Sequence, residues 1–278
     1  MLGTLGLDAG VQGPPGVHLA ERFLFFEADR LLGRDGDPLP VRGLDFRSIA
    51  NVVGVGVTLQ LGDGAGPFWT SAFAVPAARV RTRAELPAIS FDREGLGDLA
   101  IEPMKLGWRS SRFDVIGSYD VYAPTQQLNR KGIARSQWTH QLSAGGTLWL
   151  DDGRGFRLTA LASWNLYERK SGIDLTRGQT VQVQGGLGGR FLRIVDLGVA
   201  TYALWQVQDD HGADLPPQVA GLRERAVGIG PEMGVLLPWI RSKFTVRYEW
   251  GIAGRSRLDG DILVLGLTFA AWRPEPVP

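Results

Sequence analysis

A strict alternation of side-chain character over residues 180–207 limits what this chain can fold into. Val181, Val183 and Leu187 share one parity, while the residues between them are polar or glycine. Successive side chains of a strand point to opposite faces, so the pattern predicts a strand with one apolar and one polar face. A second strand of the same kind, over 195–207, follows after a very short link. The two are therefore expected to pair as a hairpin.

The length of these strands indicates a membrane protein. Each runs about ten residues or more, whereas strands of soluble sheets usually have five or six, and about ten tilted residues cross a bilayer. The 278-residue chain has no run of 18 apolar residues, which excludes a helical span but not a β-barrel. Its 38 glycines suit a curved sheet, and its nine tryptophans suit the interfacial girdles of a barrel.

Ten further segments carry a strand pattern, giving an all-β fold, an antiparallel transmembrane β-barrel of about 12 strands. The links after the second, fourth, sixth, eighth and tenth strands are short, and those after the first, third, fifth, seventh and ninth are longer. Outer-membrane barrels likewise have short periplasmic turns and longer external loops. The sequence thus predicts a flexible leader or lumenal segment (1–15), a single barrel (16–270) and a Pro-rich tail (271–278). The predicted strands cover 17–28, 47–61, 68–78, 98–109, 113–123, 138–150, 156–168, 180–191, 195–207, 225–237, 244–253 and 261–269.

The expected location is the bacterial outer membrane, with outer-membrane lipid and the outer-membrane assembly machinery as partners. Residues 1–16 contain no Lys or Arg and no apolar core of a signal peptide. We therefore interpret the chain as a mature form with an added Met1. Thirty basic and 29 acidic residues leave a net charge of +1, so no nucleic-acid partner is predicted.

Five short motifs are spread over most of the chain: Pro14-Pro15-Gly16, Gly97-Asp98-Leu99, Ala123-Pro124-Thr125, Gly230-Pro231-Glu232 and Arg247-Tyr248-Glu249. With these motifs the chain resembles the outer-membrane family named for the meta-pathway of phenol degradation. Gln126 departs from the pattern, since the family often has Gly there. This resemblance implies a barrel that admits hydrophobic substrates in the breakdown of aromatic compounds.

Polar and charged residues on the inward parities are the candidate site. Buried charges must be paired or hydrated, so these residues either form a salt-bridged plug or line a polar constriction in a solute path. The parity changes near Pro103, where we expect a bulge, and the faces of Glu102 and Lys105 stay unassigned. The predicted lumen-lining residues are Asp114, Asp120, Arg157, Gln182, Gln184, Arg190, Asp196, Glu232, Arg247 and Glu249.

The leading functional hypothesis is an outer-membrane channel or transporter for small hydrophobic or aromatic compounds, working by passive diffusion. The leader or the arginine-bearing loop 79–97 is expected to fold inside and narrow the path. One alternative is a barrel enzyme with a site at the external rim, which needs a Ser or Asp beside His140 or His211. Another is a structural or designed barrel without transport. No catalytic residue, metal site or cofactor is predicted.

Overall fold

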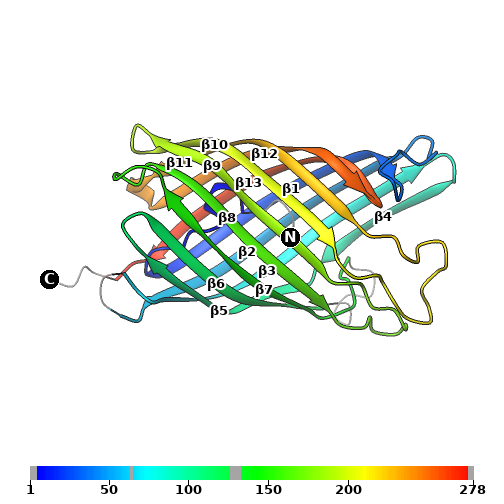
Figure 1. Cartoon of the computed structure of the whole chain (residues 1–278), viewed down its shortest axis with the longest axis horizontal. Helices are drawn as coiled ribbons and strands as arrows, with labels where there is room; N and C mark the ends of the chain where they lie inside the picture. Colours follow the sequence, from blue (N-terminus) through cyan, green and yellow to red (C-terminus); the bar gives the residue numbers. More distant parts are fainter. Residues whose placement is uncertain (1–4, 63–64, 126–132, 275–278) are drawn as a thin grey trace.

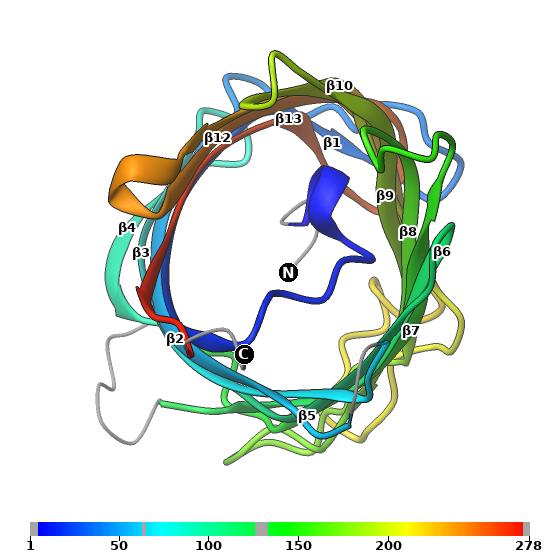
Figure 2. The same cartoon turned by 90° about the vertical axis from the view of Figure 1, so that its left-hand side faces the viewer.

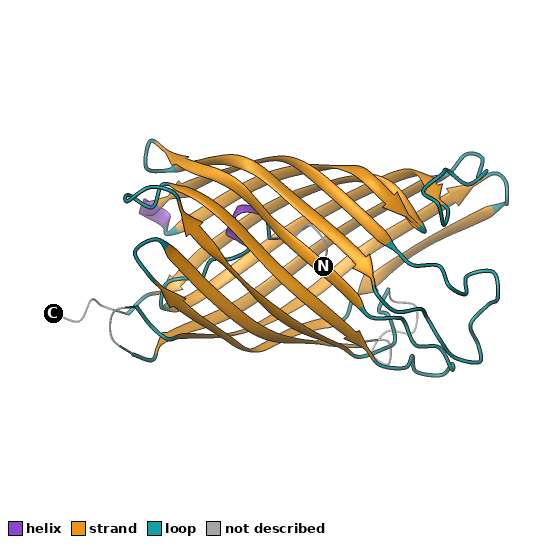
Figure 3. Ribbon diagram, in the orientation of Figure 1, coloured by secondary structure: helices purple, strands orange, loops and turns teal. Residues whose placement is uncertain are grey.

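The computed structural model describes residues 5–62, 65–125 and 133–274, which form one antiparallel sheet around a central axis (Figures 1 and 3). Two short 3₁₀ helices, η1 (Gly6–Asp8) and η2 (Pro238–Ile240), interrupt the strands. Among the described residues, no helix is long and apolar enough to cross a membrane. The strands are β1 (Gly16–Leu32), β2 (Asp45–Gln60), β3 (Phe68–Ala84), β4 (Ile89–Leu96), β5 (Leu99–Arg109), β6 (Phe113–Ala123), β7 (Thr139–Trp149), β8 (Phe156–Tyr167), β9 (Thr180–Phe191), β10 (Val195–Gln206), β11 (Arg225–Leu237), β12 (Ser242–Arg255) and β13 (Arg257–Trp272).

Twelve of these strands form a closed ring, which confirms the predicted antiparallel barrel. Each strand pairs with its neighbours in order, and the β2–β3 pairing together with β1–β13 closes the circle. Figure 1 shows the tilted strands, with short turns at one end and longer loops at the other. This sorting of the links, with short periplasmic turns and longer external loops, is also as predicted.

β4 lies outside the ring, and here the sequence interpretation was wrong. Residues 79–97 were expected to be a loop, but β3 continues to Ala84 and pairs with β4. Arg79 and Arg81 both bind Asp92 across this hairpin, and their guanidiniums, that of Arg79 first, hold the pKa of Asp92 well below its usual range. The hairpin extends the wall at the long-loop end. A strand that leaves the membrane meets water on both faces, so it loses the alternation that marks the others.

The expected irregularity at Pro103 is present. The pairing of β5 with β6 shifts register between Ile101 and Met104, and the pairing of β3 with β5 shifts between Thr70 and Ala72. Glu102 and Lys105, whose faces could not be assigned, form an ion pair at 3.2 Å. Residues 63–64 and 126–132, between predicted strands, and residues 275–278 of the predicted tail lie outside the described residues.

The outer surface is apolar along its whole circumference. On β8 the burial alternates residue by residue, with Leu158 and Trp164 exposed and Arg157 and Thr159 buried. The same holds for β9 to β11, so large aliphatic and aromatic side chains form an exposed band. A patch of this size on a soluble protein would drive association, and it instead suits the hydrocarbon region of a bilayer.

We expect the protein to remain monodisperse only in detergent or lipid, because water would leave this apolar band uncovered. Size-exclusion chromatography with light scattering, before and after detergent removal on adsorbent beads, checks this. The expected outcome is a monomer-sized protein–detergent particle that aggregates when the detergent is withdrawn. A monodisperse, detergent-free monomer would contradict the membrane assignment.

Candidate functional site inside the barrel

The leader crosses the inside of the barrel. Figure 2, which looks along the barrel from the short-turn end, shows this dark blue segment spanning the interior, with η1 close to β9. Ala9 packs with the inward side chains of Ile116 on β6 and Leu161 on β8, and Leu5 packs against the same group. The inner wall therefore holds the leader partly by apolar contact.

Glycines of β9 and β10 form a cradle for Leu7, which is fully buried. A Cβ atom added at Gly186, Gly188 or Gly198 would lie 2.8–2.9 Å from a Leu7 methyl group, closer than real Cβ atoms approach other atoms. At these three glycines the same Cβ would also meet a carbonyl oxygen of the paired strand at 2.4–2.8 Å, so a larger residue there would displace Leu7, the strand or both. The glycine-rich parity of β9 makes room for the leader.

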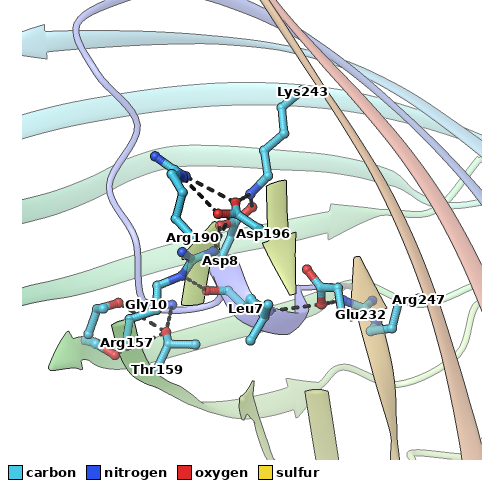
Figure 4. A network of polar contacts seen from close by, with 12 residues as sticks. Leu7, Asp8, Gly10, Arg157, Thr159, Arg190, Asp196, Glu232, Lys243 and Arg247 are labelled. Atoms are coloured by element: carbon cyan, nitrogen blue, oxygen red, sulfur yellow. Dashed lines mark hydrogen bonds and ion pairs between the residues drawn. The ribbon is translucent and has the colours of Figure 1, made fainter. Parts of the chain in front are cut away.

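A cluster of charges lies beside this cradle (Figure 4). Asp196, 1% exposed, accepts hydrogen bonds from Arg190 at 2.8 Å and from Arg157 at 3.3 Å, and lies 3.1 Å from the Lys243 ammonium. Asp8 of the leader joins the cluster through Lys243 at 2.6 Å and Arg157 at 3.4 Å. Three cations thus share two carboxylates, so each buried charge has a partner.

A second set of charged residues holds the backbone of η1. Glu232 accepts a hydrogen bond from the Leu7 N–H at 3.0 Å and binds Arg247 at 3.1 Å. The Nε atom of Arg247 lies 3.4 Å from a carboxylate oxygen of Glu249, and all three charged side chains are buried. The Leu7 carbonyl in turn accepts from Arg157 at 3.2 Å. Both sets of charged residues therefore bind η1, the same turn of the leader.

The remainder of the leader forms hydrogen bonds with residues of the inner wall. Gly10 donates to the hydroxyl of Thr159 at 2.7 Å, and the Gln12 side chain donates to Thr70 at 2.6 Å. Arg109 donates to the carbonyl oxygens of Gln12 and Gly13 at 2.8 and 2.9 Å. Leader contacts thus reach β3, β5 and β8, on several sides of the barrel.

The other predicted lumen residues are spread over the inner wall. Asp114 pairs with Arg154 and accepts from the Trp149 indole at 3.2 Å. Asp120 accepts from Ser118 at 3.1 Å. Gln184 contacts the Leu5 N–H at 3.4 Å, whereas Gln182 lines a separate cavity. The structure thus brings six of the ten residues (Arg157, Arg190, Asp196, Glu232, Arg247 and Glu249) into the two charge clusters, and their part in a solute path stays a prediction.

A cavity of about 440 Å³ opens at the long-loop end, inside the ring. Tyr122 and Tyr167 line it, and the Arg177 guanidinium lies 5.0 Å from the centre of the Tyr167 ring. Arg177 also pairs with Glu224, which lies 3.3 Å from Arg257. This mouth is polar and aromatic, and Leu204 adds an apolar side chain to its lining.

Two members of the charge cluster were missed by the sequence reasoning. Asp8 lies in the leader, where no periodicity assigns a face, and Lys243 directly precedes the predicted strand 244–253. An acidic residue in a glycine-rich leader gives no indication of its partner. The inward glycines Gly186 and Gly188 were a usable indication, since a smooth inner wall leaves space that something must fill.

The histidines do not supply the arrangement that the enzyme hypothesis requires. Among the described residues, His140 hydrogen-bonds Tyr119 at 2.7 Å and Glu168 at 3.1 Å, on the outer parity of the barrel. His211 exchanges backbone hydrogen bonds with Thr176 at the long-loop end. Within the described residues, neither His140 nor His211 forms a hydrogen bond with a serine or an aspartate.

Asp8→Asn should loosen the leader. The substitution keeps the size of the side chain but removes the charge that Lys243 and Arg157 share, so the leader loses its ionic contact with the wall. We expect more frequent conductance steps in planar-bilayer recordings and faster cleavage of the leader by an added protease. Asp29→Asn serves as the control, because it removes an exposed carboxylate near the C-terminal end of β1. Identical recordings for Asp8→Asn and the unmodified protein would show that the ionic contact does not hold the leader.

Solved structures of similar shape are outer-membrane barrels. The crystal structure of the outer-membrane channel from Pseudomonas putida F1 matches with a TM-score of 0.80 and 14% identity, covering 94% of this chain and 97% of that one. The transport unit of the autotransporter AIDA-I from Escherichia coli gives 0.55 and 11%, covering 92% and 89%. At these identities the likeness shows the fold alone.

The sequence itself identifies the family. No curated protein sequence matches this chain. Residues 28–265 match the family described as "Putative MetA-pathway of phenol degradation". This match confirms the resemblance that the short motifs predicted. Because it spans far more than half of the sequence, the chain belongs to that family.

Proposed function

We propose that this protein lets small hydrophobic or aromatic compounds cross the bacterial outer membrane by passive diffusion through the barrel. The observation that carries the proposal is an apolar cluster on the inner wall. Tyr202, Leu204, Ala226, Ile262 and Val264 are buried together on the inward parities of β10, β11 and β13, with Leu24 and Phe26 of β1 packed against them. A channel for water-soluble solutes has no need of such an apolar cluster, since porin interiors are polar.

The apolar cluster connects two open spaces. Leu204 belongs to the cluster and also lines the cavity at the long-loop end. Leu24 packs against the cluster and also lines a second pocket beside Leu5 of the leader. A hydrophobic solute that enters at the external mouth therefore has apolar contacts from the mouth down to the leader.

The leader is the gate in this proposal. It crosses the lumen and contacts two charge clusters of the inner wall, so free diffusion of ions is restricted while it stays bound. A barrel of 12 strands is wider than the eight-stranded kind that side chains fill. The leader therefore occupies the part of the lumen that the wall side chains leave open. Movement of the leader would let a solute pass to the periplasm.

Uptake of the fluorescent aromatic probe N-phenylnaphthylamine by bacteria that express the protein tests the proposal. The intact outer membrane excludes this probe, and its fluorescence rises when it reaches the inner leaflets. We expect faster uptake with the protein than with an empty vector, and slower uptake with Ile262→Asn or Val264→Asn in the apolar cluster. Thr268→Asn, on the same strand and parity but outside the cluster, is the matched control. Uptake equal to that of the empty vector would refute the proposed function.

A further inference from the structure

Two consecutive residues of the leader fill two neighbouring sites on the inner wall (Figure 4). Leu7 is fully buried in the glycine cradle of β9 and β10. The carboxylate of Asp8 lies 2.6 Å from the ammonium of Lys243 and 3.4 Å from the guanidinium of Arg157. The wall thus holds an apolar group and a carboxylate next to each other, the two parts of a small hydrophobic carboxylic acid.

The wall around Asp8 carries more positive than negative charge. Apart from Asp8 itself, the described residues of this cluster are three cations and one carboxylate: Lys243, Arg157, Arg190 and Asp196. The second set of charged residues does not offset this excess, because Arg22 interacts electrostatically with it and makes it neutral: Arg22 and Arg247 with Glu232 and Glu249. When Asp8 leaves, the uncovered wall therefore attracts an anion.

Asp8 can leave this site without disturbing the barrel wall. Its side chain is 41% exposed to the lumen, whereas that of Asp196 is 1% exposed. Asp196 keeps two hydrogen bonds from Arg190, at 2.8 and 3.1 Å, so the buried carboxylate stays paired when Asp8 departs. Lys243 is half-buried and can be reached from the lumen. A dissolved carboxylate can therefore replace Asp8 on the same cations.

We propose that the sites of Leu7 and Asp8 together bind a small hydrophobic carboxylate, and that the leader is an internal competitor for this ligand. The carboxylate of the ligand binds Lys243 and Arg157, and its apolar chain enters the glycine cradle. One ligand displaces both side chains, so its binding releases η1 from the wall. A neutral molecule of the same shape gains no charge-assisted hydrogen bond there. This inference rests on the proposed function, because it gives the gate of the channel a ligand that opens it.

Binding is measured by fluorine NMR on the full-length protein in lipid nanodiscs, with empty nanodiscs as the blank. The probes are 6,6,6-trifluorohexanoate and its neutral amide, 6,6,6-trifluorohexanamide. We expect saturable binding that is about tenfold or more tighter for the carboxylate. Asp8→Asn should tighten the carboxylate about threefold or more, because the tethered competing charge is gone. Asp29→Asn, on the exposed end of β1, should leave both affinities unchanged.

Lys243→Gln and Lys105→Gln form a matched pair, and both are made in the Asp8→Asn protein so that the internal competitor is the same. Lys105 is a half-buried lysine of β5 that pairs with Glu102 at 3.2 Å instead. Lys243→Gln should weaken the carboxylate about tenfold or more, since a charge-assisted hydrogen bond is lost. Lys105→Gln should leave the affinity unchanged, and heat-modifiable mobility on gels shows that each variant is folded.

Release of the leader is followed in the unmodified protein by its cleavage with an added protease. The carboxylate should speed this cleavage about threefold or more, and the amide should not. Four results would each overturn the inference: equal binding of the two probes, carboxylate binding that Asp8→Asn leaves unchanged or weakens, equal losses with the two lysine variants, or unchanged cleavage. If the binding results hold while uptake of N-phenylnaphthylamine matches the empty vector, the site stands and the proposed function fails. If uptake holds but the two probes bind alike, the function stands and the site falls.

Discussion

Removal of residues 2–12 is expected to raise the single-channel conductance of the protein at least about twofold, because the lumen of a 12-stranded ring is otherwise wide enough for ions. The deleted segment contains Leu7, which is fully buried, and Asp8, which pairs with Lys243 and Arg157 of the inner wall. It also contains Gln12, whose bonds to Thr70 and Arg109 reach the opposite side of the ring. Planar-bilayer recordings of the purified protein in symmetric salt give the measurement.

The hairpin of β3 and β4 supplies the control for this deletion. From the sequence alone, shortening 81–94 was also expected to raise the conductance, since the segment was interpreted as a loop that folds inside. The structure instead places the hairpin in the wall at the long-loop end, with Arg79 and Asp92 exposed. Its removal should leave the conductance unchanged. A change with the hairpin and none with the leader would reverse the assignment of the gate.

A full-length variant separates the position of the leader from its presence. Gly188→Leu places a large side chain in the cradle of Leu7, where even a Cβ would lie 2.8 Å from its methyl group. The leader is then retained but displaced. We expect a conductance between those of the unmodified and the deleted proteins, and recordings identical to those of the unmodified protein would mean that the cradle does not position the leader.

The barrel could be predicted from the sequence because alternation reports directly on burial. On β8 to β11 one parity meets lipid and the other meets the interior, so a pattern of period two fixes both the strand and its faces. The inward charges Arg157, Asp196 and Glu232 could be proposed as candidates for the same reason. Their partners could not be predicted, because parity gives the face of a residue and not its neighbours on distant strands.

The contacts of the leader and the strand β4 escaped prediction for different physical reasons, although the leader was one of the two segments expected inside the barrel. Residues of the leader have no repeating pattern, since each one fits a different part of the inner wall: Leu7 a glycine cradle, Asp8 a pair of cations, Gln12 a threonine hydroxyl. β4 does form regular backbone hydrogen bonds, but it lies beyond the membrane, and its exposed residues mix Ile89 and Phe91 with charged side chains without a sustained alternation. In both cases the missing information is the environment, which only the folded chain supplies.

Leu187→Arg should lower the free energy of unfolding by ~2–4 kcal/mol, the cost of an arginine that faces lipid near the bilayer midplane. Leu187 is 54% exposed on the outer parity of β9, opposite Val199 of β10, near the middle of both strands. Reversible urea unfolding in lipid vesicles, followed by tryptophan fluorescence, gives the value. Leu187→Ala shows how much of the loss comes from the missing leucine alone.

The same substitution at Leu197 tests the depth of the membrane. Leu197 lies on the same face but only two residues after the start of β10 at the short-turn end. An arginine there can reach the lipid headgroups, so the cost should fall to about 0–1 kcal/mol. Equal costs at the two positions would mean that the outer face of β9 and β10 does not span a hydrocarbon layer as described. A larger cost at Leu197 would place the midplane nearer the short turns, and the band of exposed apolar residues would then have to be repositioned along the barrel axis.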